Sequence, residues 1–150
     1  MQPAVSFAPA LADDFEELLA LRVEAMRESL ERIRRFDPQR ARERFQSSFA
    51  PAFTRHVLLG SERVGFVALR PGSGVLLLDH LYLRPAHQGH GLGSAVLARL
   101  FAEADAAKLP VRVGALRDSD SNRFYLRHGF VAVEQTEWDI FYVRQARSSG

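Results

Sequence analysis

The sequence predicts a mixed α/β fold, with a mostly antiparallel sheet of about six to seven strands flanked by about four helices. Three apolar stretches in the middle of the chain are joined by very short loops, which connect antiparallel strands. Apolar residues recur at helical spacing on either side of these stretches. One helical stretch separates two predicted strands, which makes those strands parallel neighbours. Residues 1–150 are expected to form a single domain.

The first third of the chain is predicted to hold one short strand and two helices. Residues 5–7 form the strand. Asp13 is the expected N-cap of a long helix, with Glu16 completing a capping box. Apolar residues spaced by three or four carry this helix to about residue 35. Asp37-Pro38 then starts a second helix, as an N-cap followed by proline at the first position.

The remaining elements follow from apolar runs and turn residues. Predicted strands cover residues 56–59, 64–69, 75–83, 111–116, 130–133 and 138–143. A helix that begins at Leu92 connects the third of these strands to the fourth. Residues 118–120 offer caps for a short helix, and Gly129 stands where a left-handed residue would end it. Residues 144–150 are expected to form a disordered tail.

Composition excludes several classes of function. No run approaches the ~20 apolar residues of a membrane span, and the N-terminus lacks a signal pattern, so a cytoplasmic protein is expected. Zero cysteines exclude a disulfide framework and a thiolate metal site. The five histidines show no metal-ligand spacing, and no metal is expected. A net charge of +2 gives no indication of nucleic-acid binding.

Arginine is concentrated in the two predicted N-terminal helices. Between Arg27 and Arg44 lie seven arginines and four acidic residues. One interpretation is a surface that attracts an acidic acceptor molecule. The other is two solvated helix faces with ion pairs inside each helix, each worth only tenths of a kcal/mol. The second interpretation is favoured.

Three alternating glycines form the clearest motif, in the run Gln88-Gly89-His90-Gly91-Leu92-Gly93. The run follows a predicted strand and opens a predicted helix, where backbone N–H groups and the helix dipole attract an anion. Glycine lets a phosphate approach the backbone and permits positive φ. The dinucleotide fingerprint does not fit, because Ser94 stands where its third glycine is needed, and the P-loop pattern fails too. The run therefore predicts a diphosphate site.

The glycine run and a second motif carry a resemblance to a known family. Gln-x-x-Gly-x-Gly directly follows Leu81-Tyr82-Leu83-Arg84-Pro85, and a short helix ending in Tyr-x-x-x-Gly-Phe lies at residues 122–130. In this order and spacing, the two motifs resemble the GNAT superfamily of acyl-CoA-dependent N-acetyltransferases. The resemblance implies a GNAT-type sheet with a splayed parallel strand pair. It also implies transfer of an acetyl group from acetyl-CoA to a primary amine, by direct attack in a ternary complex.

The resemblance further implies which residues bind the cofactor. The glycine run would grip the pyrophosphate through its backbone. Backbone groups at the end of the preceding strand would bind the pantetheine amides and the thioester oxygen. The residues concerned are Leu81, Tyr82, Leu83, Gln88, Gly89, His90, Gly91, Leu92, Gly93 and Ser94.

Tyr125 matches the family's tyrosine, four residues before Gly129, and is the expected general acid. A phenol with a pKa of about 10 keeps its proton at neutral pH and can transfer it to a thiolate leaving group. The family usually has asparagine seven residues before this tyrosine. Asp118 stands there instead and would bring a carboxylate near an anionic cofactor.

The expected general base is less well marked. Family members often carry a glutamate on one of the two parallel strands, but the matching positions here are Leu77 and Val113, which accept no proton. Asp79 lies on the same strand face as Leu77, because side chains alternate along a strand. It is the expected substitute, directly or through a water, whereas His56 and His80 are expected to be structural. An acceptor amine with a lowered pKa would need no protein base.

Two other functions are compatible with the sequence. The missing glutamates fit a non-catalytic acyl-CoA-binding module, which turnover of any amine would exclude. A nucleotide-phosphate binder of another fold predicts an ATP affinity comparable to that for CoA. No pattern identifies the acceptor, which could be a small molecule, a peptide N-terminus or a protein lysine.

The last predicted hairpin carries large apolar side chains on both faces, at Trp138, Ile140, Phe141 and Tyr142. A strand that is apolar on both faces must be covered twice. The chain's own core supplies one cover, and a second copy of the chain would supply the other. A homodimer is therefore expected.

Overall fold

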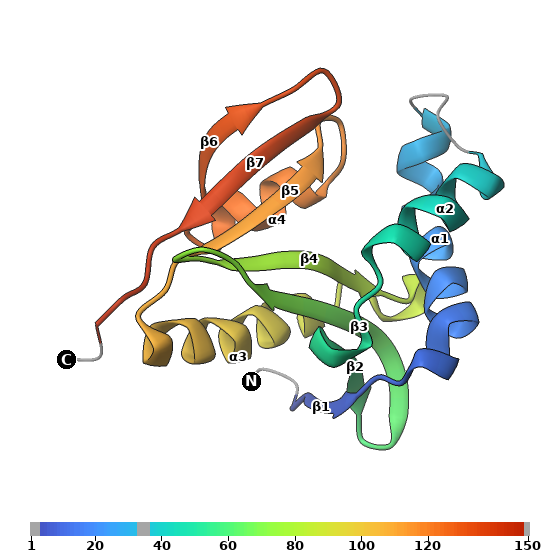
Figure 1. Cartoon of the computed structure of the whole chain (residues 1–150), viewed down its shortest axis with the longest axis horizontal. Coiled ribbons are helices and arrows are strands. Elements are labelled where there is room, and N and C mark those ends of the chain that lie inside the picture. The colour runs from blue at the N-terminus through green and yellow to red at the C-terminus, as the bar shows by residue number, and fades with distance from the viewer. Residues whose placement is uncertain (1–3, 33–36, 149–150) are drawn as a thin grey trace. The chain divides into compact units, whose positions relative to one another are not determined.

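The computed structural model describes residues 4–32 and 37–148, without the side chains of residues 28–30 and 32. The chain divides into two compact units. The first comprises Met1–Ala68 and His80–Ala95, and the second comprises Leu69–Asp79 and Val96–Gly150. Three elements, labelled in Figure 1, contain residues of both units, namely β3 (Glu62–Pro71), β4 (Leu76–Leu83) and α3 (Leu92–Ala107).

Seven strands form one sheet in the order β1-β2-β3-β4-β5-β7-β6. The β4–β5 pair is parallel, whereas β1–β2, β2–β3, β5–β7 and β6–β7 are antiparallel. With four α-helices in the described residues, the predicted fold class is confirmed, and each predicted strand is found with its ends displaced by at most two residues. The other strands are β1 (Ser6–Pro9), β2 (Thr54–Leu59), β5 (Val111–Leu116), β6 (Val131–Gln135) and β7 (Asp139–Arg144).

The parallel ladder between β4 and β5 is short. It pairs residues 76–78 with residues 111–113, although β4 has eight residues and β5 has six. The predicted parallel connection through α3 is therefore confirmed. Strands that pair over only part of their length can separate beyond the ladder, which is the arrangement that a splayed pair requires.

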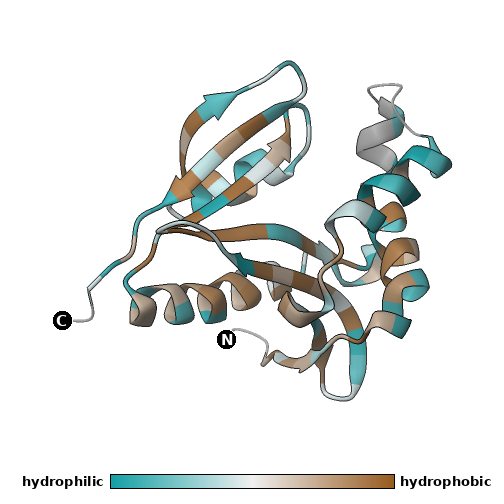
Figure 2. Ribbon diagram, in the orientation of Figure 1, coloured by the Kyte–Doolittle hydropathy of each residue, from teal (hydrophilic) through white to brown (hydrophobic). Residues whose placement is uncertain are grey.

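In the first unit, α1 (Phe15–Arg32) packs its apolar stripe against aromatic residues. Three leucines of α1 are buried together with Phe45 of α2 (Pro38–Ser48) and Phe66 of β3. The rings of Phe45 and Phe66 meet edge-on at 5.7 Å, a favourable geometry. Figure 2 shows α2 as mostly hydrophilic, and its buried residues are Ala41 and Phe45.

The start of α1 differs from the prediction. A 3-10 turn, η1 (Ala12–Asp14), precedes the helix, which begins at Phe15. The side chain of Asp14, rather than that of Asp13, accepts a hydrogen bond from the backbone N–H of Leu11 (2.8 Å). The predicted cap at Asp13 is wrong because this additional turn moves the first exposed N–H groups toward the N-terminus.

Glu16 does not close the predicted capping box. Its two carboxylate oxygens accept hydrogen bonds from Arg42 of α2, at 2.7 and 2.9 Å. The predicted extension of α1 to residue 35 lies outside the described residues. The predicted start of α2 is confirmed, because the Asp37 side chain accepts two backbone N–H bonds and Pro38 is the first helical residue.

The second unit is organised around β5, β7 and the C-terminal part of α3. Arg144 of β7 is buried, and its guanidinium carbon lies 3.9 Å from the ring centre of Phe101 on α3. Asp105 accepts two hydrogen bonds from this guanidinium, at 2.8 and 3.3 Å. Helix α4 (Ser121–Arg127) is followed by Gly129 with φ of 89°, so the predicted left-handed residue is confirmed.

Candidate functional site

The glycine run forms a loop between β4 and α3, within the first unit. A 3-10 turn, η3 (Pro85–His87), leads to Gln88, whose Nε2 donates a hydrogen bond to the carbonyl oxygen of Leu83 (3.0 Å). Gly89 and Gly91 have φ of 79° and 81°. Residues with a side chain rarely adopt this region, so the predicted need for positive φ is confirmed at both positions.

The backbone of this loop is accessible. Gly89 and Gly91 are exposed, and a Cβ added to Gly89 would meet no atom within 4 Å. Ala95 is the first residue of α3 whose N–H donates to a carbonyl four residues earlier, that of Gly91 (3.1 Å). The N–H groups of the preceding turn therefore lie at the positive end of the helix dipole, outside the helical ladder. Phosphate oxygens bind at such positions.

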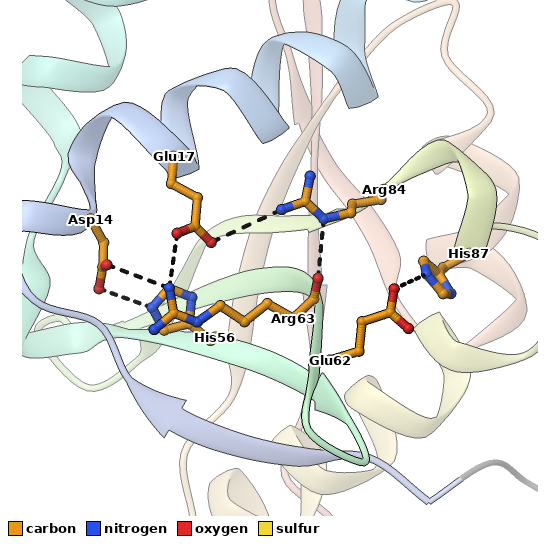
Figure 3. A network of polar contacts seen from close by, with 7 residues as sticks. All are labelled: Asp14, Glu17, His56, Glu62, Arg63, Arg84 and His87. Carbon is orange, nitrogen blue, oxygen red and sulfur yellow. Dashed lines mark hydrogen bonds and ion pairs between the residues drawn. The ribbon is translucent and has the colours of Figure 1, made fainter.

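A network of charged side chains holds the base of this loop (Figure 3). Arg84, directly after β4, donates from Nε to the carbonyl oxygen of Arg63 (3.1 Å), and its Nη2 lies 4.0 Å from Glu17 of α1. Glu17 also accepts a hydrogen bond from Arg63 (2.8 Å). At the end of η3, His87 lies 3.3 Å from Glu62. The path from β4 to α3 is thus tied to both α1 and β3.

The same network reaches a buried histidine. His56 of β2 is 1% exposed, and its Nε2 lies 2.9 Å from the Asp14 carboxylate. Asp14 also accepts the backbone N–H of Leu11 and lies 3.6 Å from Arg63. The backbone bond and then the bond from His56 lower the pKa of Asp14 below its usual range. His56 is therefore engaged in packing β2 against η1.

Leu81, Tyr82 and Leu83 are half-buried at the end of β4. The neighbouring strand β3 approaches this segment very closely. A Cβ added to Gly65 of β3 would collide with the carbonyl oxygen of Tyr82, so glycine is required there. The sequence analysis missed Gly65, although a glycine inside an apolar strand signals such a close approach.

Tyr125 lies in α4, within the second unit, and is buried. Its ring packs against those of Phe130 and Tyr142, with centroid separations of 5.3 and 6.2 Å. Its carbonyl oxygen accepts backbone N–H bonds from His128 and Phe130, which close the helix. Tyr125 is therefore held on a well-packed helix and not on a loop.

Asn122 organises the turn between β5 and α4, a role that the sequence analysis missed. Its Nδ2 donates to the carbonyl oxygens of Leu116, Arg117 and Ser119, at 2.7, 3.1 and 2.9 Å. Its Oδ1 accepts a hydrogen bond from the hydroxyl of Tyr142 (2.7 Å). Burial raises the pKa of Tyr142, which keeps this hydroxyl a donor.

The caps predicted at residues 118–120 are wrong. Asp120 occupies the N-cap position, but its backbone is helical and its side chain makes no capping bond. Asn122 instead stabilises this turn from within the helix, through the preceding carbonyls. Asparagine commonly makes such local bonds to the backbone, and this preference was the signal available in the sequence.

Asp79, the expected substitute base, lies in the second unit and pairs with Arg70 across the β3–β4 hairpin. Nε of Arg70 donates to Oδ2 (2.7 Å), and Nη2 donates to Oδ1 (3.4 Å). The bond to Asp79 raises the pKa of Arg70 above its already high value. Both carboxylate oxygens of Asp79 are therefore engaged by one guanidinium.

His80 lies on the opposite face of β4 from Asp79 and is buried. Its ring packs against Phe45 and Phe66, with centroid separations of 5.2 and 5.7 Å. Its Nε2 lies 3.2 Å from Oγ of Ser48 on α2. This face of β4 therefore meets α2 within the first unit.

No group of three His, Asp or Glu side chains in the described part of the chain is placed to hold a metal ion. Within residues 4–32 and 37–148, no helix combines the length and apolarity that crossing a membrane requires.

Solved acetyltransferases share this fold. The PaiA N-acetyltransferase of Thermoplasma acidophilum, crystallised with coenzyme A, gives a TM-score of 0.77 at 14% identity, over 95% of this chain and 99% of that chain. An acetyltransferase of Thermus thermophilus gives 0.70 at 22% identity, over 97% and 99%. A GNAT-family acetyltransferase of Bacillus cereus gives 0.67 at 12% identity, over 96% and 99%. At these identities the comparison establishes the fold alone.

Comparison of the sequence with protein families is more specific. A family model described as an acetyltransferase (GNAT) domain matches residues 54–132. This segment is more than half of the chain and contains both the glycine run and Tyr125. A search of curated proteins gives no match. The family match and the shared fold together show that this chain belongs to the GNAT acetyltransferase family.

Proposed function

We propose that this chain transfers an acetyl group from acetyl-CoA to a primary amine by direct attack in a ternary complex. The observation that carries the proposal is the exposed glycine run at the start of α3, with positive φ at Gly89 and Gly91. Glycine adopts this conformation without strain and leaves no side chain between the backbone N–H groups and a phosphate. The CoA pyrophosphate is the anion that these N–H groups would bind.

The cofactor is held mainly by backbone groups in this proposal. The N–H groups of residues 89–94 bind the pyrophosphate, supported by the helix dipole of α3. Backbone groups of Leu81, Tyr82 and Leu83 bind the pantetheine amides and polarise the thioester oxygen. The ties of Arg84 to Arg63 and Glu17 keep both segments in position.

The chemical step needs one proton donor. The amine nitrogen attacks the thioester carbon, the carbon–sulfur bond breaks, and the CoA thiolate takes a proton. Tyr125 supplies this proton as the general acid, because a phenol remains protonated at neutral pH. Its packing against Phe130 and Tyr142 supports a fixed position of the ring.

The amine must also lose a proton, and Asp79 is the candidate acceptor, directly or through a water. In either route the proton ends on Asp79, whose two carboxylate oxygens both accept hydrogen bonds from Arg70. This ion pair and the apolar residues Leu77 and Val113 also favour a second candidate function, a non-catalytic acyl-CoA-binding module.

A thiol-release assay with acetyl-CoA and a broad panel of amines tests the proposal, together with calorimetric titration of CoA. Saturable CoA binding and release of thiol with at least one amine are expected. Binding without turnover of any amine would establish the binding module instead. Absence of CoA binding would overturn both functions.

We also propose that the β6–β7 hairpin forms a homodimer interface. Val131 and Val133 of β6 are 64% and 53% exposed, and Trp138 is 41% exposed. An exposed group of large apolar side chains is typical of an interaction surface. Light scattering should give twice the chain mass of 16.8 kDa, and a monomer mass at tens of micromolar protein would contradict the proposal.

A further inference from the structure

Arg22 is a charged residue on the apolar stripe of α1. Phe15, Leu18 and Leu19 precede it on this stripe, and both leucines are buried. Arg22 itself is half-buried. Its guanidinium carbon lies 5.8 Å from the ring centre of Tyr82 on β4. The cation is thus directed toward the strand and not toward bulk solvent.

No carboxylate of the described residues pairs with Arg22. Three and four residues away along α1 stand Leu18, Leu19, Ala25 and Met26, so the helix offers no internal ion pair. The Nε atom of Arg22 is buried and has no hydrogen-bond partner in the described chain. A buried charged donor without a partner is unfavourable, so the chain itself does not neutralise this guanidinium, and only its terminal Nη groups could meet a ligand anion.

Nearby arginines differ from Arg22 in this respect. Arg42 pairs with Glu16, and Arg63 pairs with Glu17. The acidic side chains at the start of α1 are therefore already engaged. No carboxylate of this part of the described chain competes for Arg22, and the contact that it does make, with an aromatic ring, leaves its donors available.

The position of Arg22 relates it to the proposed thioester segment. Tyr82, over which it lies, is the central residue of the segment Leu81-Tyr82-Leu83. Its ring also lies 5.9 Å from that of His80, on the face of β4 that packs toward α2. Phe15 and Phe49 are partly buried beside the same core. An amine approaching the thioester from this face would have both a cation and apolar rings beside it. Asp79 lies on the opposite face of β4, so an amine bound here would attack as the free base, without Asp79 as its proton acceptor.

Building on the proposed function, we propose that Arg22 binds a carboxylate of the acceptor, and that the acceptors are small primary amines carrying a carboxylate, such as free α-amino acids. The planar guanidinium matches a carboxylate with two parallel hydrogen bonds. A single cation suits a monoanion better than a phosphate dianion. The chemistry of acetyl transfer is unchanged, and Arg22 contributes to the choice and orientation of the acceptor.

Matched amines that differ only in the carboxylate test this assignment. The pairs are L-phenylalanine with phenethylamine, L-tyrosine with tyramine, and L-lysine with cadaverine, each assayed by thiol release from acetyl-CoA. In at least one pair, kcat/KM should favour the amino acid. Arg22→Met should lower kcat/KM for that amino acid by about ten- to a hundredfold, the usual worth of a charge-assisted contact, and leave its partner amine unchanged.

Thermal unfolding separates a binding role from a structural one. Arg22→Met keeps an unbranched apolar stem and removes an unpaired charge, so the Tm should stay the same or rise. A lowered Tm with an unchanged amine preference would show that Arg22 only packs against Tyr82, and would overturn the proposal. Arg40→Met is the matched control, because Arg40 is an exposed arginine of α2; it should change neither quantity.

A binding measurement distinguishes failure of this inference from failure of acetyl transfer. N-acetyl-L-phenylalanine and N-acetylphenethylamine are titrated into CoA-saturated protein and into its Arg22→Met variant. Arg22-dependent binding of the acid without turnover of any amine would refute acetyl transfer and retain the carboxylate site. Turnover that is equal for both members of every pair would refute the carboxylate site and retain acetyl transfer. If neither Arg22-dependent binding nor a preference is found, the Arg22 assignment is refuted.

Discussion

The turns before α3 and α4 both connect a strand to a helix, but they are built differently. Each helix follows a strand of the parallel pair, and each begins after a tight turn. At α3, exposed glycines at positive φ leave the backbone accessible. At α4, the Asn122 side chain binds three carbonyl oxygens of the preceding turn and the hydroxyl of Tyr142. One turn is open to a ligand, and the other is satisfied by its own chain.

In the proposed function, this difference separates cofactor binding at the start of α3 from proton transfer by Tyr125 on α4. An open turn built from glycine presents N–H groups to an anion but positions no side chain. In the turn before α4, Asn122 binds three carbonyl oxygens, and it thereby fixes α4 and the ring of Tyr125. We therefore expect variants at α3 to change cofactor affinity and variants at α4 to change rate or stability.

The largest effect is expected for Tyr125→Phe, which removes one oxygen and keeps the packing of the ring. The catalytic rate should fall by a factor of ~10² to 10⁴, the usual worth of a positioned general acid. The loss should appear in kcat and kcat/KM alike, with little change in acetyl-CoA binding. Tyr142→Phe is the control, because it also removes a buried tyrosine hydroxyl, and it should retain most of the rate. Near wild-type turnover of Tyr125→Phe would mean that water protonates the thiolate, and an equal loss of cofactor affinity would mark a binding residue.

Asn122→Ala tests the closed turn. It leaves the carbonyl oxygens of Leu116, Arg117 and Ser119 and the hydroxyl of Tyr142 without their partner. The free energy of unfolding should fall by about 2–3 kcal/mol, measured by urea denaturation, while the CoA affinity of the folded protein is retained. Asn122→Asp keeps the acceptor for Tyr142 but places a carboxylate oxygen against three carbonyl oxygens, so it should lose at least as much stability. The CoA affinity is measured under conditions in which Asn122→Ala is fully folded. A loss of affinity there would contradict the expectation that only variants at α3 change cofactor binding.

Gly91→Val tests the open turn. A β-branched residue at φ of 81° is strained, and its side chain occupies space next to the proposed pyrophosphate. CoA affinity should fall at least about tenfold, or about 1.4 kcal/mol, while the domain still folds. Gly74→Val is the matched control, because Gly74 has φ of 69° in the β3–β4 turn. Gly74→Val should lower stability to a similar extent and leave CoA affinity unchanged. Equal CoA affinities of wild type, Gly91→Val and Gly74→Val would refute the assignment of the glycine run as a phosphate site.

The smallest effect concerns the network behind the open turn. The pKa of Asp14 is lowered from 3.8 in the folded chain, so its contribution to stability is present above that pH. It is lost as pH falls through the lower, folded pKa. Asp14→Asn should therefore be less stable than wild type at neutral pH, with the difference shrinking in acid. Urea denaturation over this range measures it, Asp13→Asn serves as control, and a pH-independent difference would contradict the linkage.

Most of the fold was predictable because its signals are local. Alternating glycines, the Asp37-Pro38 pair and the apolar periodicities specify backbone conformation over a few residues. The positive φ at Gly89 and Gly91, the start of α2 and the predicted strands are confirmed, whereas the predicted extension of α1 to residue 35 lies outside the described residues. The misassigned caps at Asp13 and at residues 118–120 depend instead on one extra turn and on Asn122. Several polar residues near each helix start could have served as caps, and propensity alone does not choose among them.

By itself, the sequence determined the order of strands and helices, the parallel crossover through α3 and the places where only glycine is tolerated in a turn. These features follow from chain connectivity and backbone sterics. Tertiary structure alone decided that Asp79 pairs with Arg70, that Gly65 lies against Tyr82 and that Arg22 faces a ring without a carboxylate partner in the described chain. Each of these depends on which side chains from other strands or helices come within a few ångströms, a property that spacing along one segment does not encode.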